Sequence, residues 1–253
     1  MSEILSYTGF SVPILEVQDL TIEYPIRTRG IGGVKLSRRH DDSRITANTS
    51  GRPVAKALAQ VSFRLEAGDR LGLLGSNGSG KSTLLRALAG ILPPSRGLVY
   101  REGSLQALFN VNAGFSAHST GRRNIYLRGL INGWTEDQIS AATIDVIEFA
   151  QLGAYIDMPL NTYSAGMSAR LAFAIATCFP SDILLMDEWI GAGDRDFRKK
   201  ADDRLNRIIE QAGILVIASH NIEILKNNCN KIFILELGCI KDEGSSESIL
   251  ASY

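Results

Sequence analysis

The stretch Gly75-Ser-Asn-Gly-Ser-Gly-Lys-Ser-Thr83 decides the fold of this 253-residue chain. It fits the phosphate-binding pattern G-x-x-x-x-G-K-[ST], in which glycines let successive backbone N–H groups point at phosphate oxygens. Lys81 supplies a positive charge for the β- and γ-phosphates, and the Ser82 hydroxyl can ligate Mg²⁺. We therefore predict that a nucleotide binds to the whole loop: Gly75, Ser76, Asn77, Gly78, Ser79, Gly80, Lys81, Ser82 and Thr83.

The residues on either side of the loop support this prediction. Residues 70–74 form a short apolar run suited to a buried strand, and residues 84–89 favour a helix. The N-terminus of that helix would then face the phosphates. A Gly/Ser-rich surface loop would not require this order of strand, glycines, Lys-Ser and helix.

Composition limits the class of protein. Hydrophobic residues make up 45% and charged residues 21% of the chain, as in ordinary globular domains, and the length suits one large domain or a domain with a subdomain. The net charge of +0 does not indicate a broadly basic nucleic-acid binder. Three cysteines without metal or redox spacing are expected to be free thiols. Because no apolar run is long enough to span a bilayer, work at a membrane would require docking on a partner.

Strand and helix patterns alternate along the chain, which predicts an α/β core with a parallel sheet. The capping box Thr135-Glu-Asp-Gln138 predicts the start of one helix. Strands are expected at 14–24, 57–66, 70–74, 97–109, 182–188 and 214–219, with a hairpin over 232–242. Helices are expected at 84–89, 135–150, 166–179, 198–211, 222–227 and 247–252.

In the stretch Asp182-Ile-Leu-Leu-Met-Asp-Glu188, four apolar residues are followed by two acids, Asp187 and Glu188. Buried strands of parallel sheets bring their carboxyl ends to the ligand crevice, so these acids are expected near the nucleotide. Asp187 would hold Mg²⁺, and Glu188 would orient and polarise the attacking water. The alternative is a solvated turn.

Tyr163-Ser-Ala-Gly-Met167 resembles the Leu-Ser-Gly-Gly-Gln signature of ABC ATPases, with Ser164 lying 23 residues (187 − 164) before Asp187. The helix N-terminus there would present unpaired N–H groups and a positive dipole. The resemblance implies that Ser164, Ala165 and Gly166 contact the γ-phosphate of ATP on a second subunit, which closes a head-to-tail homodimer. Taken alone, the pentapeptide could be a helix N-cap and no more.

Further matches run from about residue 14 to residue 253. Gly191-Ala-Gly-Asp194 resembles the D-loop that contacts the partner subunit, and His220 resembles the switch histidine that senses the γ-phosphate. Tyr24 matches the aromatic residue that stacks on adenine, although a tyrosine could also pack in the core. The family fold has a P-loop core, an N-terminal antiparallel β subdomain and a helical subdomain, expected here at about 116–165.

Departures from the family pattern are also present. The signature has Ala165 and Met167 in place of Gly and Gln. The glutamine expected near residues 109–113 is missing, and either Asn110 or Asn112 could replace it.

Several details resemble the ATPase subunits of bacterial polysaccharide exporters, which move O-antigen, capsule or teichoic-acid chains. These are the Tyr-Ser-x-Gly-Met signature, the stretch Thr120-Gly-Arg-Arg-Asn124 and Phe197 after Gly193-Asp194. The resemblance implies ATP and Mg²⁺ as cofactors, a separate transmembrane permease, a lipid-linked glycan as cargo, no nucleic acid, and a place on the cytoplasmic face of the inner membrane. The alternatives are another exported substrate, or a soluble ABC-type ATPase acting on nucleic acid or a protein assembly.

Two further expectations concern the C-terminal end of the chain and an inserted segment. The chain ends at Tyr253, so no C-terminal carbohydrate-binding domain is expected. Residues 27–52 match an insertion of the exporters and are strongly basic. They could be a solvated loop, or they could guide a lipid-linked glycan at the membrane surface. The basic residues are Arg27, Arg29, Lys35, Arg38, Arg39, Arg44 and Arg52, against Asp41 and Asp42.

Overall fold

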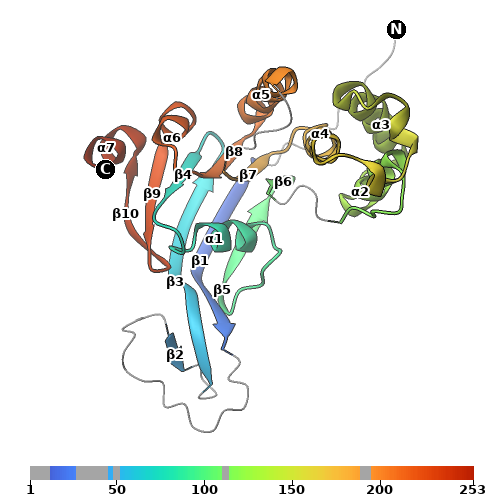
Figure 1. The fold of residues 1–253 in the computed structure, drawn as a ribbon. Helices are drawn as coiled ribbons and strands as arrows, with labels where there is room; N and C mark the ends of the chain where they lie inside the picture. The colour runs from blue at the N-terminus through green and yellow to red at the C-terminus, as the bar shows by residue number, and fades with distance from the viewer. Residues whose placement is uncertain (1–11, 27–44, 48–51, 110–113, 189–194) are drawn as a thin grey trace. The chain divides into compact units, whose positions relative to one another are not determined.

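The computed structural model describes residues 12–26, 45–47, 52–109, 114–188 and 195–253 (Figure 1). They form two compact units, Met1–Ser104 with Gly213–Tyr253, and Leu105–Ala212. Three features expected from the sequence lie outside the described residues: most of the basic segment, the two asparagines at 110 and 112, and the D-loop motif with Asp194. The expected helical subdomain at 116–165 falls within the second unit.

The first unit contains an antiparallel sheet, as the family resemblance implied. Its strand order is β2-β3-β1-β5, and every neighbouring pair is antiparallel. The strands are β1 (Ile14–Pro25), β2 (Ile45–Ala47), β3 (Pro53–Glu66) and β5 (Arg96–Glu102). The register of β1 shifts between Val17 and Leu20, where Asp19 has a φ of 47°, as in a β-bulge.

The same unit contains four strands of a mixed sheet in the order β10-β9-β4-β8. These are β4 (Arg70–Leu74), β8 (Ile214–Ala218), β9 (Lys231–Glu236) and β10 (Cys239–Ser245). Strand β4 is parallel to both β8 and β9, while β10 runs antiparallel to β9. All five residues of β8 are buried, which explains its continuous apolar run. Helices of this unit are α1 (Lys81–Leu88), α6 (Ile222–Asn228) and α7 (Ser246–Ser252).

The described residues of the second unit combine a parallel strand pair with four α-helices. Strand β6 (Leu105–Leu108) pairs with β7 (Ile183–Asp187). The helices are α2 (Gly121–Ile131), α3 (Glu136–Ala150), α4 (Ala165–Ala176) and α5 (Arg195–Gln211), with short 3₁₀ turns at η1 (Gly153–Asp157) and η2 (Leu160–Thr162). Both hydrogen bonds of the capping box predicted at Thr135 are present. The α/β core with a parallel sheet is therefore confirmed.

Two differences from the sequence-based expectation have local causes. Helix α4 ends at Ala176 rather than at residue 179, because Thr177 leaves the helical conformation and Pro180 follows. Helix α2 was not expected, since it contains Gly121 and Gly129, which weaken the helical pattern. Gly129 is required by packing: a Cβ there would lie 2.5 Å from Ile139 Cγ1 of helix α3.

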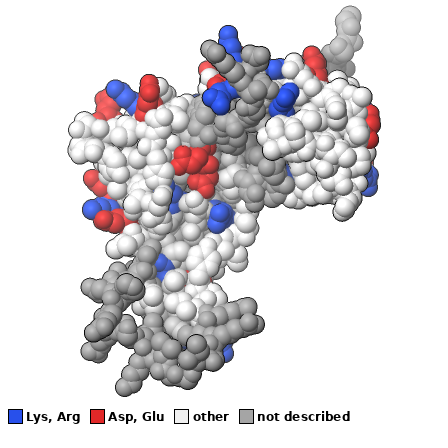
Figure 2. All heavy atoms as spheres, in the orientation of Figure 1, with Lys and Arg blue, Asp and Glu red and all other residues white. Residues whose placement is uncertain are grey.

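Two expectations from composition concern the distribution of charged side chains and the hydropathy of the helices. Figure 2 shows a largely uncharged face on which Lys and Arg side chains are scattered and Asp and Glu side chains include one central cluster. Among the residues described, no helix is both long and apolar enough to cross a membrane.

The three cysteines are free and differ in exposure, which leads to a labelling prediction. Burial raises the pKa of the Cys178 and Cys229 thiols to about 12, whereas Cys239 is exposed. Only the thiolate is nucleophilic, and a pKa near 12 leaves roughly 10⁻⁴ of a thiol ionised at pH 8. With maleimide at pH 8, we expect one fast-reacting thiol per folded chain and three after unfolding, measured by intact mass. Cys239→Ser should remove the fast thiol, and fast labelling of Cys178 in that variant would contradict the prediction.

Candidate nucleotide site

The phosphate loop joins β4 to α1, and three of its glycines adopt left-handed conformations that side chains disfavour. The φ angles are 143° at Gly75, 79° at Gly78 and 114° at Gly80. A Cβ at Gly75 would lie 2.3 Å from the Leu235 carbonyl oxygen, and a Cβ at Gly80 would lie 2.9 Å from that of Ala57. The glycines are therefore required both by the turn and by the backbone packed against it.

Lys81 stands at the first position of α1 and is only 7% exposed. Its Nζ donates to the carbonyl oxygens of Gly75 at 2.6 Å and Ser76 at 3.1 Å, so the ammonium group lies over the loop. Among the described residues, no side chain caps α1 at Gly80, and a helix N-terminus is a favourable place for an anion.

Ser79 supports the fit of an anion in the loop. The side chain is buried, and within the part of the chain that the structure describes its Oγ has no hydrogen-bond partner. A buried hydroxyl without a partner is costly, and a phosphate oxygen would satisfy it. Together with the glycine turns and the uncapped helix, this group makes the loop suitable for a nucleotide phosphate chain.

Two other predicted residues lie in the same unit. β4 and β8 are parallel neighbours, with Leu73 opposite Ala218, so their carboxyl ends meet at one edge of the sheet. This places His220, which is exposed and follows β8, at the edge where the phosphate loop leaves β4. Tyr24 on β1 is 40% exposed, so it is not simple core packing and its ring is accessible. Adenine stacking remains a prediction.

The two acids lie at the end of β7 in the second unit. Residues 183–186 are completely buried, Asp187 is partly exposed, and Glu188 is exposed. Glu188 has a φ of 69°, a left-handed conformation that a non-glycine residue adopts at a cost. Such strained residues cluster at functional sites, so the conformation favours a functional carboxylate over an ordinary solvated turn.

The signature segment begins helix α4. Ser164 is the N-cap, and its Oγ accepts a hydrogen bond from the Met167 backbone N–H at 3.2 Å. Ser164 and Ala165 are exposed. Of the residues described, a Cβ at Gly166 would have only Ser164 Oγ nearby, at 3.9 Å. Packing within this described part of the chain does not require the glycine, so there is room beside the helix terminus.

The motif Thr120–Asn124 proves to be a structural support for this segment. Asn124 is fully buried, and its Nδ2 donates to the carbonyl oxygens of Ser116, Ser119 and Thr120 at 3.1, 3.3 and 2.9 Å. Its Oδ1 accepts from the Ser116 N–H at 2.8 Å. The Ser119 carbonyl then accepts from the Leu160 N–H at 3.0 Å, which ties this loop to the chain entering the signature. Sequence reasoning used the motif only as a mark of resemblance and missed this role.

Gly121 makes room for Tyr163, the residue before Ser164. The Tyr163 hydroxyl donates to the Tyr155 carbonyl oxygen at 2.5 Å. It also occupies the space that a side chain at position 121 would need, because a Cβ there would lie 2.4 Å from the hydroxyl oxygen and 2.9 Å from Ile156 Cδ1.

We therefore expect Gly121→Ala to displace Tyr163 and to destabilise the protein by about 1–3 kcal/mol, the usual cost of overpacking. Denaturant unfolding measures the loss, and ATPase activity should fall with it because Ser164 follows Tyr163 directly. Tyr163→Phe removes the nearest clashing atom and should restore part of the stability when combined with Gly121→Ala. If Gly121→Ala is as stable and active as the wild type, the packing argument is wrong.

A strand, a glycine-rich turn and a helix starting at Lys-Ser define a P-loop nucleotide-binding protein. Residues 58–191 match the family model for ABC transporters. The chain is 39% identical over 228 residues to the O-antigen export system ATP-binding protein RfbE of Yersinia enterocolitica, covering 89% of this chain and 95% of the relative. It is 32% identical over 241 residues to the corresponding protein RfbB of Klebsiella pneumoniae, covering 95% and 97%.

A third relative is longer. The teichoic acids export ATP-binding protein TagH of Bacillus anthracis is 38% identical over 197 residues, which are 78% of this chain but 36% of that protein.

Among solved structures, an ABC transporter ATP-binding subunit matches with a TM-score of 0.67 at 20% identity, covering 94% of this chain and 92% of the other. An ATP-binding cassette dimer with ADP and Pi matches with a TM-score of 0.66 at 18% identity, covering 92% and 98%. These two likenesses support the fold alone.

The chain belongs to the ABC transporter family. It binds and hydrolyses ATP, and its similarity to polysaccharide-export subunits agrees with the prediction made from the sequence.

Proposed function

We propose that this chain is the ATP-hydrolysing subunit of a bacterial exporter that moves a lipid-linked polysaccharide across the cytoplasmic membrane. It works as a homodimer attached to the cytoplasmic face through a separate transmembrane permease. The observation that carries the proposal is the similarity to the Yersinia O-antigen export subunit over 95% of that protein's length. The structural use of the exporter-like Thr120–Asn124 motif, which supports the signature segment, agrees with it.

Each candidate residue has a role in this proposal. The loop from Gly75 to Thr83 cradles the phosphates, with Lys81 neutralising their charge, and Tyr24 stacks on adenine. His220 senses the γ-phosphate. From the second subunit, the groups that complete the site are Ser164, Ala165, Gly166 and Asp194.

The hydrolytic step needs a water molecule aligned with the γ-phosphorus. Glu188 accepts a hydrogen bond from this water and polarises it. Ser82 and Asp187 would hold Mg²⁺ through their side-chain oxygens, and the ion would offset the charge on the phosphates. Closing of the second subunit brings the N-terminus of α4 toward the γ-phosphate, where its N–H groups stabilise the developing negative charge.

Deletion of the gene in its host tests whether the transported substrate is a lipid-linked polysaccharide. We expect surface polysaccharide to disappear and its lipid-linked precursor to accumulate inside the cell, measured by surface labelling and lipid extraction. Expression of the wild-type chain should reverse both changes, whereas the Glu188→Gln variant should not. Unchanged surface polysaccharide would reject this class of cargo while leaving the ATPase activity in place.

A further inference from the structure

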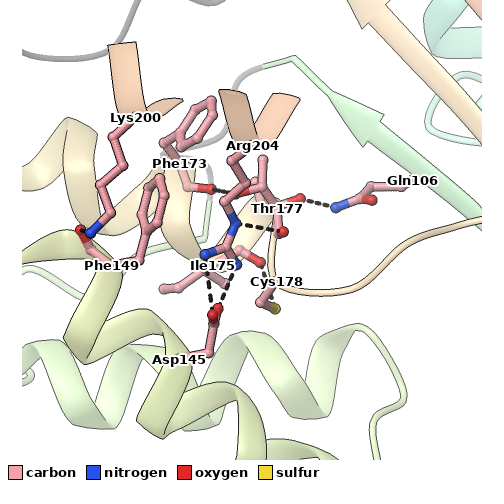
Figure 3. Close-up of polar contacts among 10 residues, drawn as sticks. Gln106, Asp145, Phe149, Phe173, Ile175, Thr177, Cys178, Lys200 and Arg204 are labelled. Atoms are coloured by element: carbon pink, nitrogen blue, oxygen red, sulfur yellow. Dashed lines mark hydrogen bonds and ion pairs between the residues drawn. The ribbon is translucent and has the colours of Figure 1, made fainter. Parts of the chain in front are cut away.

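The C-terminal end of the signature helix α4 is held by side chains from two other elements (Figure 3). Arg204 Nε, from α5, donates to the Thr177 carbonyl oxygen at 2.9 Å. The side-chain amide of Gln106, from β6, donates to the Ala176 carbonyl oxygen. The last carbonyls of a helix have no partner within the helix, and a cation is favoured at this end of the dipole. These contacts therefore satisfy the terminus and fix its position.

Arg204 also binds helix α3. Its Nη1 lies 3.2 Å from Asp145 Oδ1, and its Nη2 donates to Asp145 Oδ2. The guanidinium carbon lies 4.3 Å from the centre of the Phe149 ring. Arg204 is only 8% exposed, so its guanidinium group is shielded from solvent, although the Asp145 side chain is half-exposed. A lysine could not make the forked ion pair, the carbonyl bond and the ring contact together.

Aromatic side chains of the three helices also pack together beside this arginine. The Phe149 ring of α3 stacks on Phe173 of α4 at 5.9 Å and meets Phe197 of α5 edge-on at 5.3 Å. One guanidinium thus joins α3, α4 and α5 at the point where these rings meet. Helix α5 starts at Arg195, directly after the predicted partner-contacting residue Asp194.

We propose that Arg204 is a positioning residue for ATP hydrolysis: by fixing the C-terminal end of α4, it fixes where the opposite end presents Ser164. The inference rests on the proposed function, because it needs Ser164 to meet ATP bound to a second copy of this chain. Twelve residues make a rod of ~18 Å, and a tilt of about 5° moves its far end by roughly 1.5 Å. A displacement of about 1 Å at a catalytic group can cost on the order of 10²-fold in rate.

The test replaces Arg204 with methionine, which keeps the apolar stem and removes the guanidinium. We expect kcat to fall at least 10-fold, while the Kd for ATP of the monomer stays within about twofold, because the phosphate loop lies in the other unit. In the Glu188→Gln background, MgATP-dependent dimer formation, measured by light scattering, should require at least 10-fold more protein. The matched control is Arg207→Met. Arg207 is an exposed arginine of the same helix whose Nε donates to the backbone carbonyl oxygen of Asp203 at 3.3 Å, and its loss should change neither quantity.

Asp145→Asn provides a second variant if Arg204→Met does not fold. It keeps the shape of a half-exposed side chain and removes the charge from the ion pair. It should also lower kcat, but by a smaller factor than Arg204→Met does. The double variant Asp145→Asn/Arg204→Met should lose less activity than the product of the two single effects.

The outcomes separate the two hypotheses. If Arg204→Met lowers the melting temperature but keeps wild-type kcat and dimer formation, Arg204 is only structural and this inference is wrong. If the parent Glu188→Gln protein forms no dimer with MgATP, even with its permease, the composite site of the proposed function fails instead.

Discussion

Replacing Glu188 with glutamine is expected to leave MgATP affinity unchanged and to lower the turnover of ATP by about 10²-fold or more, the usual scale for loss of a general base. The variant keeps the size of the side chain and removes the charge that would polarise the attacking water. Its position supports the role: Glu188 directly follows the buried strand β7 and holds a φ of 69°. Such a conformation has a cost that a merely solvated side chain would not explain.

The measurement combines phosphate release and nucleotide binding on one preparation. Glu210→Gln, an exposed acid on helix α5, is the matched control and should keep wild-type turnover. Near-normal turnover in Glu188→Gln would remove Glu188 from the catalytic role and would direct attention to another acid or to His220.

Ser164→Arg is expected to abolish hydrolysis while ATP binding to the phosphate loop remains. The substitution removes a helix cap, which costs about 1 kcal/mol, and places a bulky cation on an exposed helix terminus. If that terminus closes on ATP of a second subunit, the arginine blocks the closed dimer, and turnover should fall on the order of 10²-fold. Size-exclusion chromatography of the Glu188→Gln background with MgATP should show monomer only.

Two further substitutions separate the cap from the closing surface. Ser164→Thr keeps a capping oxygen and should remain active. Ser164→Asp also caps the helix, yet its carboxylate would repel the γ-phosphate, so it should be as stable as the wild type and inactive. Wild-type hydrolysis by Ser164→Arg would contradict the composite site and leave this segment as an ordinary N-cap.

Features determined by short stretches of sequence could be predicted. The strand, loop and helix around Gly80, the capping box at Thr135 and the buried strand before Asp187 all depend on residues within a few positions of one another. Their hydrophobic periodicity and turn chemistry are sufficient to define them.

Features determined by distant contacts could not be predicted. Helix α2 contains two glycines that are needed because a side chain there would clash with Tyr163 or Ile139, which are distant in the sequence. Helix α5 has the charged pattern of a solvated helix, which conceals that Arg204 is buried against Asp145, 59 residues away. The left-handed conformation of Glu188 likewise could not be expected from its residue type, since non-glycine residues rarely adopt it.

The two hydrogen bonds from Lys81 Nζ to the carbonyl oxygens of Gly75 and Ser76 change how the lysine's contribution should be understood. An ammonium group has three N–H donors, and these carbonyls take two of them, so phosphate oxygens that need more than one donor must displace a carbonyl acceptor. The ATP affinity that Lys81 contributes is therefore the difference between its bonds to phosphate oxygens and its bonds to the loop carbonyls. In the absence of nucleotide, the bonds to the carbonyls stabilise the loop. A variant lacking this side chain would lose loop order as well as charge. Its weaker ATP binding would then report both losses together.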